Sequence, residues 1–194
     1  MKYTKALATT LILSTAIFAT EANTTAANAQ MAIKQEGVKY IKMLGKALQG
    51  EMKKHMQADK SGLEAVKFCS EKARELGKEI NSKLPENVRV RRTSLKIRDP
   101  KNKPDETDIK VMQSYLEKMK EGKFNPKDIQ VVEVNGTKRV YKPLVVGKAC
   151  LKCHGSNISP EIAEVIKKNF PEDKAVGFKE GDLRGVVVAE IKQK

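Results

Sequence analysis

The chain has 194 residues, of which 40% are hydrophobic and 32% charged, so a packed core is expected and collagen-like, cysteine-scaffold, polytopic membrane and wholly disordered classes are excluded. Its 38 Lys and Arg residues outnumber its 24 Asp and Glu residues, and the net charge of +14 favours anionic partners. Nucleic acid is not an expected partner, because the basic residues are spread along the chain and only 5 Phe, 4 Tyr and no Trp residues can stack on bases.

The N-terminal segment has the pattern of a secretory signal peptide. Lys2 and Lys5 form a positive start, residues 6–19 are an apolar run, and Ala27-Asn28-Ala29 offers a cleavage site. Cleavage after Ala22 and an uncleaved anchor are alternatives, although the run is shorter than the roughly 20 residues that a membrane-spanning helix needs.

We therefore predict a signal peptide over 1–29 and one mature domain over 30–194. The mature domain is expected in the periplasm, without a stable membrane span once the signal peptide is cleaved.

Two helices are predicted at the start of the mature domain. The first has an apolar stripe at steps of three and four, formed by Ile41, Leu44, Leu48, Met52 and His55. Residues 59–62 interrupt the pattern, and Ser61 with Glu64 suggests a capping box for the second helix. Its stripe, which should end before Pro85, consists of Val66, Cys69, Ala73, Leu76 and Ile80.

The rest of the chain mixes strands with shorter helices. We predict a strand over residues 88–98 and a loop over 99–108. The next helix, which should end near Gly122, has an apolar stripe formed by Ile109, Met112, Leu116 and Met119. Strands over 128–134 and 138–146 flank Asn135-Gly136, a strong hairpin signal. A short helix after Ser159-Pro160 and a last strand over 183–191 complete the pattern.

This order predicts an α+β fold. We expect an antiparallel sheet backed by helices on one face, with paired N-terminal helices, in a PAS-like arrangement.

The strongest chemical signal is Cys150-Leu151-Lys152-Cys153-His154. Cys-x-x-Cys-His is the attachment motif of haem c, in which both thiols form thioethers with the haem vinyl groups and the adjacent His ligates iron. Attachment takes place outside the cytoplasm, in agreement with the predicted signal peptide. A thioredoxin-like site would need a βαβ context, a zinc site would need further ligands, and a disulfide across two residues would be strained.

The motif does not identify the second axial ligand of the iron. Cys69 is the remaining cysteine and would supply a thiolate, which lowers the reduction potential. It could equally be a small buried hydrophobe. His55 is the only other histidine. Methionine or an open position are further alternatives, and the candidate methionines are Met43, Met52, Met56, Met112 and Met119.

The chain resembles the PAS-like haem c-binding domains, a family first described as a domain of unknown function that occurs alone in the periplasm or ahead of bacterial sensor kinases. The resemblance covers about 33–191. The segments that carry it are Ala65-Val66-Lys67-Phe68-Cys69, Arg91-Arg92-Thr93-Ser94-Leu95-Lys96-Ile97-Arg98 with Asn102, Pro104 and Asp105, Cys150-Leu151-Lys152-Cys153-His154-Gly155, Phe170-Pro171, Asp173, Ala175, Gly177, Gly181-Asp182 and Arg184-Gly185. Ile97 and Asp99 depart from the Tyr and Asn that the family often carries.

The resemblance implies a PAS-like fold and one covalent haem c between His154 and a thiolate from Cys69. It also implies that Arg92 and Arg98 lie near the haem, where guanidinium groups suit carboxylate propionates.

We expect a redox or gas sensor module that is not an enzyme. A soluble periplasmic electron-transfer cytochrome c is the alternative. The expected partners are the cytochrome c maturation machinery and an acidic redox or signalling protein.

Overall fold

The computed structural model describes residues 15–193, and the chain divides into two compact units, 1–32 and 33–194. The first helix, α1 (Thr15–Ala58), runs from the first unit into the second. The predicted signal peptide lies outside the described residues over 1–14 and is helical over 15–29, so its cleavage stays a prediction. Among the described residues, no helix combines the length and apolarity needed to cross a bilayer.

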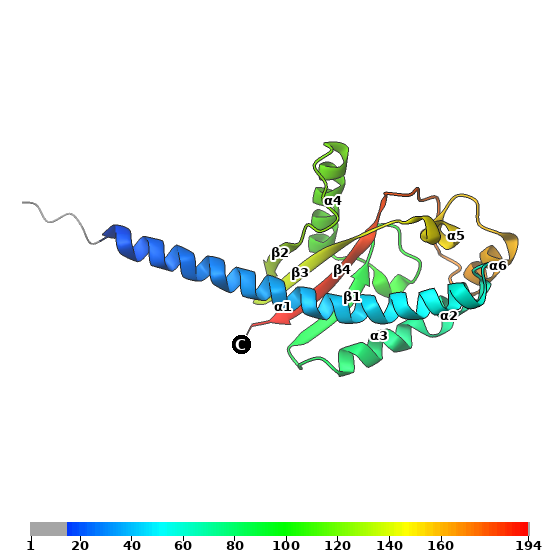
Figure 1. Cartoon of the computed structure of the whole chain (residues 1–194), viewed down its shortest axis with the longest axis horizontal. Helices are drawn as coiled ribbons and strands as arrows, with labels where there is room; N and C mark the ends of the chain where they lie inside the picture. Colours follow the sequence, from blue (N-terminus) through cyan, green and yellow to red (C-terminus); the bar gives the residue numbers. More distant parts are fainter. Residues whose placement is uncertain (1–14, 194) are drawn as a thin grey trace, which may run out of the picture. The chain divides into compact units, whose positions relative to one another are not determined.

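A four-stranded antiparallel sheet forms the centre of this unit (Figure 1). Its order is β1-β4-β3-β2. The bounds are β1 (Val88–Thr93), β2 (Gln130–Val134), β3 (Thr137–Val145) and β4 (Leu183–Lys192). β2 and β3 form the predicted hairpin, in which Asn135 and Gly136 take the positive φ values of 48° and 72° that such a tight turn requires.

Five further helices and two 3-10 turns connect the strands. They are α2 (Leu63–Glu71), α3 (Ala73–Ser82), η1 (Pro100–Asn102), α4 (Glu106–Lys120), η2 (Lys148–Cys150), α5 (Leu151–His154) and α6 (Pro160–Asn169). The α+β prediction is confirmed, and the arrangement is consistent with a PAS-like sheet backed by helices.

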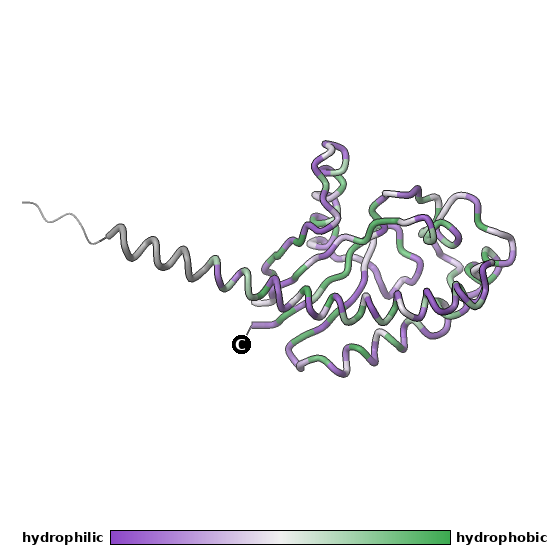
Figure 2. Tube along the Cα trace, viewed as in Figure 1, coloured by the Kyte–Doolittle hydropathy of each residue, from purple (hydrophilic) through white to green (hydrophobic). Residues whose placement is uncertain are grey.

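Helices cover both faces of the sheet, so the expectation of helices on one face was wrong. Side chains alternate along β4: Val187 and Ala189 pack in a core cluster with α1, α2 and α3, whereas Val186 and Val188 pack in a second cluster with α4. A central strand that is buried on both sides needs a continuous apolar run, and Figure 2 shows this hydrophobic stretch along β4.

A buried ionic cluster anchors α4 to the sheet. The Asp108 carboxylate is fully buried and accepts hydrogen bonds from Arg91 Nη1 (2.8 Å) and Nη2 (2.9 Å) and from the Tyr141 hydroxyl (3.0 Å). Because two strands contribute partners to one carboxylate, the cluster fixes the position of α4 on β1 and β3.

Local structure departs from the sequence prediction at several places. The predicted strand over 88–98 ends at Thr93, and α4 begins at Glu106, inside the predicted loop over 99–108. The predicted second helix is divided at Lys72 into α2 and α3, where φ is −112°. The expected Ser61 capping box is absent: Asp59 accepts the Ser61 and Glu64 main-chain N–H groups at 2.9 and 3.2 Å, while the Glu64 side chain binds Lys67. An aspartate outside the helix therefore serves as the cap.

Candidate functional site

The Cys-x-x-Cys-His motif lies on a single helical turn. Cys150 ends η2, and Cys153 and His154 end α5, so the two thiols are three residues apart on one face of the turn. Gly155 follows because any Cβ at that position would lie 2.6 Å from the Leu151 oxygen, which accepts the Gly155 N–H at 2.9 Å. The turn presents one exposed and one half-buried thiol.

His154 is held by the segment that follows α6. Its Nδ1 lies 2.7 Å from the main-chain oxygen of Ala175, and its ring packs edge-on against Phe178 with centroids 6.3 Å apart. Burial, followed by the positive charges of Arg184 and Arg98, lowers the pKa of this imidazole to about 3. The ring is therefore neutral at pH 7, with Nδ1 as the donor and Nε2 as the nitrogen that can ligate a metal.

The packing of α2 against the Cys-x-x-Cys-His turn brings Cys69 near the motif. Cys153 contacts the apolar cluster that contains Val66, and Val66 lies one helical turn from Cys69 on α2. The pKa of the Cys69 thiol is raised to about 11 by burial, while the Arg92 charge opposes the rise and the Cys153 thiol adds to it. The Arg92 charge and the Cys153 thiol thus both lie close enough to Cys69 to affect its pKa.

Arg92 lies in this site without an anionic partner. Its side chain makes no hydrogen bond or ion pair with the part of the chain that the structure describes. Burial is the main cause of its lowered pKa, and only the thiol of Cys69 and the carboxylate of Asp99 oppose that effect. The guanidinium is half-buried, and its positive charge beside Cys69 favours a bound anion.

Arg98 is placed differently. Its Nη2 donates to the main-chain oxygen of Cys153 (2.6 Å), to Asp173 (3.0 Å) and to the Ala175 oxygen (3.3 Å). Its Nε is buried and has no hydrogen-bond partner among the described residues. Arg98 therefore fastens α5 to the 173–175 segment and retains one donor for a further acceptor.

Arg184 is a third cation at the site, and sequence reasoning did not assign it a role. Its Nη1 donates to Ser94 Oγ at 2.9 Å, and its guanidinium lies 5.2 Å from the Phe178 ring centroid. Burial, and then the charges of Arg98 and Arg92, lower its pKa to about 10. The charges of Arg98 and Arg92 thus both act on Arg184, while Asp173 forms an ion pair with Arg98.

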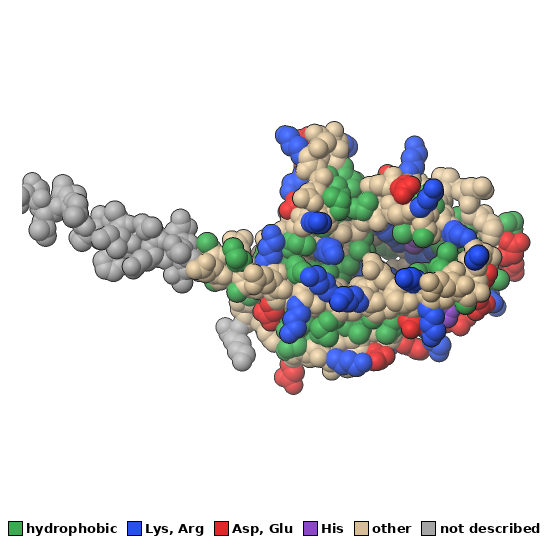
Figure 3. Space-filling view, viewed as in Figure 1, with side chains coloured by type: hydrophobic (Ala, Val, Ile, Leu, Met, Phe, Trp, Pro, Cys, Tyr) green, Lys and Arg blue, Asp and Glu red, His purple; other side chains and the backbone are tan. Residues whose placement is uncertain are grey.

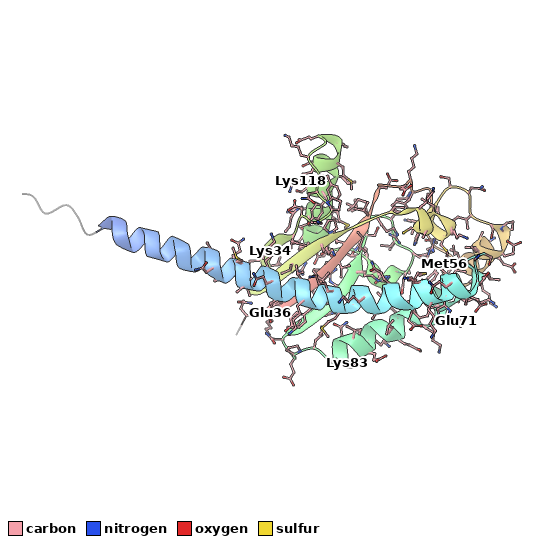
Figure 4. The ribbon with its side chains drawn as sticks, viewed as in Figure 1. Lys34, Glu36, Met56, Glu71, Lys83 and Lys118 are labelled. Carbon is pink, nitrogen blue, oxygen red and sulfur yellow. The ribbon has the colours of Figure 1, made fainter. Side chains whose placement is uncertain are left out.

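His55 and the candidate methionines lie in other contacts. The His55 ring stacks on Phe68 with centroids 5.0 Å apart, and its Nε2 is 3.8 Å from Glu51. Met56, near the end of α1 (Figure 4), lies beside Gly62, where its sulfur is 3.6 Å from the position that a Cβ would take. Met112 is completely buried in the cluster under α4.

A haem c group fits these residues. Two thiols on one turn match two vinyl groups, and a neutral imidazole has its second nitrogen free. Arg92 and the buried Nε of Arg98 match anionic propionates. Figure 3 shows the surface hollowed between α1 and the segment that carries α5. Within residues 15–193 no three His, Cys, Asp or Glu side chains form a metal-ion site, and the sheet is wholly antiparallel, so the residues do not resemble a zinc or thioredoxin site.

Sequence reasoning missed Ala175, Phe178 and Arg184 as parts of the site. Ala175 and Arg184 are among the residues that carry the resemblance, whereas Phe178 is not. No periodicity or spacing in the sequence predicts that they lie near His154, because only the fold of the 170–185 segment brings them there.

Comparison with known proteins gives a family and a structural relative. The Tll0287-like family model matches residues 13–191. The crystal structure of the cyanobacterial heme-protein Tll0287 is similar, with a TM-score of 0.52, 24% sequence identity, and coverage of 63% of this chain and 70% of that chain. At this identity the likeness shows the fold alone. No curated protein matches the chain.

Proposed function

Because the chain belongs to the Tll0287-like family, we propose that it is an exported c-type haem protein with one haem bound covalently through Cys150 and Cys153. His154 and Cys69 would hold its iron in this proposal. The structural relative is described as a heme-protein. The observation that carries the proposal is the single turn that presents Cys150, Cys153 and His154, with Nδ1 of His154 held by a main-chain oxygen.

Each surrounding residue has a defined task toward the haem, which would supply one-electron redox chemistry at its iron. The Ala175 oxygen fixes the tautomer of His154, and Phe178 restrains the ring. Arg92 favours the deprotonated form of Cys69, as a ligand thiol requires. Arg92 and the free Nε of Arg98 bind the propionates.

A redox or gas sensor is the role that this ligand set supports best. His154 and Cys69 would both hold the iron, which would leave no place on it for a substrate, and we propose no enzymatic activity. Cys69 is carried by the nine-residue helix α2. A change in the protonation state of its thiol would free α2 to shift, which gives a two-state element for signalling.

Electron transfer by a diffusing periplasmic cytochrome c is the second candidate. The observation that favours it is the positive charge: removal of 1–29 would take away Lys2, Lys5 and Glu21, and so lower the net charge only from +14 to +13. Such a charge steers association with an acidic redox or signalling partner. Both roles require export to the periplasm and the cytochrome c maturation machinery.

Expression with a maturation system, followed by extraction with acidified organic solvent and pyridine haemochrome spectra, tests the proposal. The haem of the wild-type protein should remain with the protein. The Cys150→Ala/Cys153→Ala variant should lose its haem to the solvent. Ser156→Ala, an exposed neighbour of the motif, is the matched control and should retain haem. Extractable haem in the wild-type protein, or none at all, contradicts the proposal.

A further inference from the structure

A second cavity lies on the α4 side of the sheet, between α4 and the 177–185 segment. Its volume is about 670 Å³, within the roughly 300–1,000 Å³ range of small-molecule sites. Neither the ligand thiol nor the attachment motif lines it. Phe178 stands between the two sites, since one part of the residue lines the cavity and its ring packs edge-on against His154.

The interior of the cavity is mainly apolar. The side chains that line it are Met112, Leu116, Met119, Phe124, Phe178 and Leu183. These come from α4, from the residues that follow it and from the start of β4. Phe178 and Leu183 are buried, whereas Leu116, Met119 and Phe124 are only half-buried. A bound ligand with an apolar body would shield the exposed parts of these half-buried side chains from water.

Two lysines stand at the rim of this cavity. Lys96 Nζ donates to the Val176 oxygen at 2.5 Å and lies 4.6 Å from the Phe178 ring centroid, so its position is restrained. Lys120 forms no ion pair within residues 15–193. Asp182 also lies in the wall, and its carboxylate accepts the Lys179 N–H at 2.7 Å. The wall and rim of the cavity therefore carry two positive charges and one negative charge, and the carboxylate already accepts a main-chain hydrogen bond.

We propose that this cavity binds an amphipathic monocarboxylate with an unbranched apolar tail. The tail lies along Leu116, Met119 and Phe124, and the carboxylate meets Lys96 and Lys120. Lys96 has two N–H donors beyond the one that Val176 accepts. The positive charge at the rim favours an anion, and the apolar interior favours an apolar tail. A neutral or cationic analogue would lack the ionic contact with the two lysines.

Calorimetric titration of the full mature protein with hexanoate, octanoate and decanoate tests the site. Affinity should rise about three- to fourfold for each added methylene until the tail fills the cavity. Decanol should bind at least about tenfold more weakly than decanoate, because a charge-assisted hydrogen bond is lost. Decylamine, which is cationic, should show no binding at the same concentrations.

Variants locate the binding. Leu116→Trp should fill the cavity and abolish decanoate binding, while Lys96→Gln should weaken it about fivefold or more. Lys110→Gln is the matched control, because Lys110 is exposed on α4 and does not line the cavity. Lys118, also on α4 (Figure 4), is unsuitable as a control because it forms an ion pair with Asp128. Thermal unfolding of Leu116→Trp confirms that the variant is folded.

Several outcomes would overturn the proposal: no binding at any chain length, equal affinity for decanol and decanoate, or unchanged binding by folded Leu116→Trp. The titration does not depend on haem. Absence of attached haem contradicts the proposed function and leaves carboxylate binding intact, whereas absence of binding leaves the haem assignment intact.

Discussion

The main-chain oxygen of Ala175 meets Nδ1 of His154 at 2.7 Å and also accepts a hydrogen bond from Arg98 Nη2 at 3.3 Å. One carbonyl group thereby couples the orientation of the imidazole to the guanidinium that binds Cys153 and Asp173. Because His154 and Cys153 are adjacent on α5, the His154 ring and the Cys153 main chain are held by a single set of contacts.

Loss of the Cys69 thiol should change the iron ligation without affecting attachment. Cys69→Ala should convert low-spin ferric haem to a high-spin or water-bound form and raise the midpoint potential by on the order of 100 mV, since a thiolate stabilises ferric iron. Absorption and electron paramagnetic resonance spectra measure the change. His55→Ala is the control, because His55 already stacks on Phe68. A spin change in His55→Ala but not in Cys69→Ala would show that the ligand is wrongly assigned.

Removal of the Arg92 charge should have opposite effects with and without haem. In the haem-bound protein, Arg92→Gln should lower the midpoint potential by on the order of tens of millivolts, because a positive charge near the iron is lost. In the haem-free Cys150→Ala/Cys153→Ala background, the same change should raise the free energy of unfolding by up to about 1 kcal/mol, because the repulsion between the Arg92 and Arg184 charges is removed. Voltammetry and urea unfolding measure the two effects.

Arg89, exposed on the same strand, supplies the control. Arg89→Gln should change neither the potential nor the stability appreciably. A loss of stability in haem-free Arg92→Gln would mean that Arg92 is already paired in the folded chain.

The electron-carrier alternative predicts a steep dependence on salt. If the net charge of +13 that remains without residues 1–29 steers an acidic partner, reduction by that partner should slow between ~10 mM and ~200 mM salt, as the Debye length falls from about 30 Å to less than about 10 Å. Stopped-flow measurements give the rate. A rate independent of salt would favour the sensor role.

Two glycines on α1 should respond to alanine in opposite directions. A Cβ on Gly37 would lie 2.4 Å from Val140 Cγ2, whereas a Cβ on Gly45 would have nothing within 4 Å. Gly37→Ala should therefore reduce the free energy of unfolding by about 1–3 kcal/mol through overpacking. Gly45→Ala should increase it by roughly 0.5–1 kcal/mol through helix propensity. Urea unfolding measures both, and equal effects would contradict the close contact between α1 and β3.

The cap of α2 should titrate at low pH. The Ser61 hydroxyl, followed by the Ser61 and Glu64 main-chain N–H groups, lowers the pKa of Asp59 from 3.8 to about 2. A lowered carboxyl pKa contributes stability that is present above the unfolded pKa and is lost as pH falls from about 4 to about 2. Ser61→Ala should move the Asp59 pKa back toward 3.8, as measured by NMR titration. Ser82→Ala, whose hydroxyl binds the Glu79 oxygen, should leave it unchanged.

Local signals in the sequence were sufficient for several elements. Asn135-Gly136 predicted the β2–β3 hairpin, and Ser159-Pro160 predicted the start of α6, because both features depend on residues that are adjacent in the chain. The Cys150–His154 motif was recognisable for the same reason, since its chemistry requires a fixed spacing on one turn.

The tertiary structure decided what depends on residues distant in sequence. It placed α4 on the second face of the sheet through Asp108 and Arg91, and it brought Arg184 beside Phe178. It also left Arg92 unpaired near Cys69 within the described residues. Burial and pairing of charges depend on which distant segments share a low-dielectric interior, so the local pattern of residues could not reveal them.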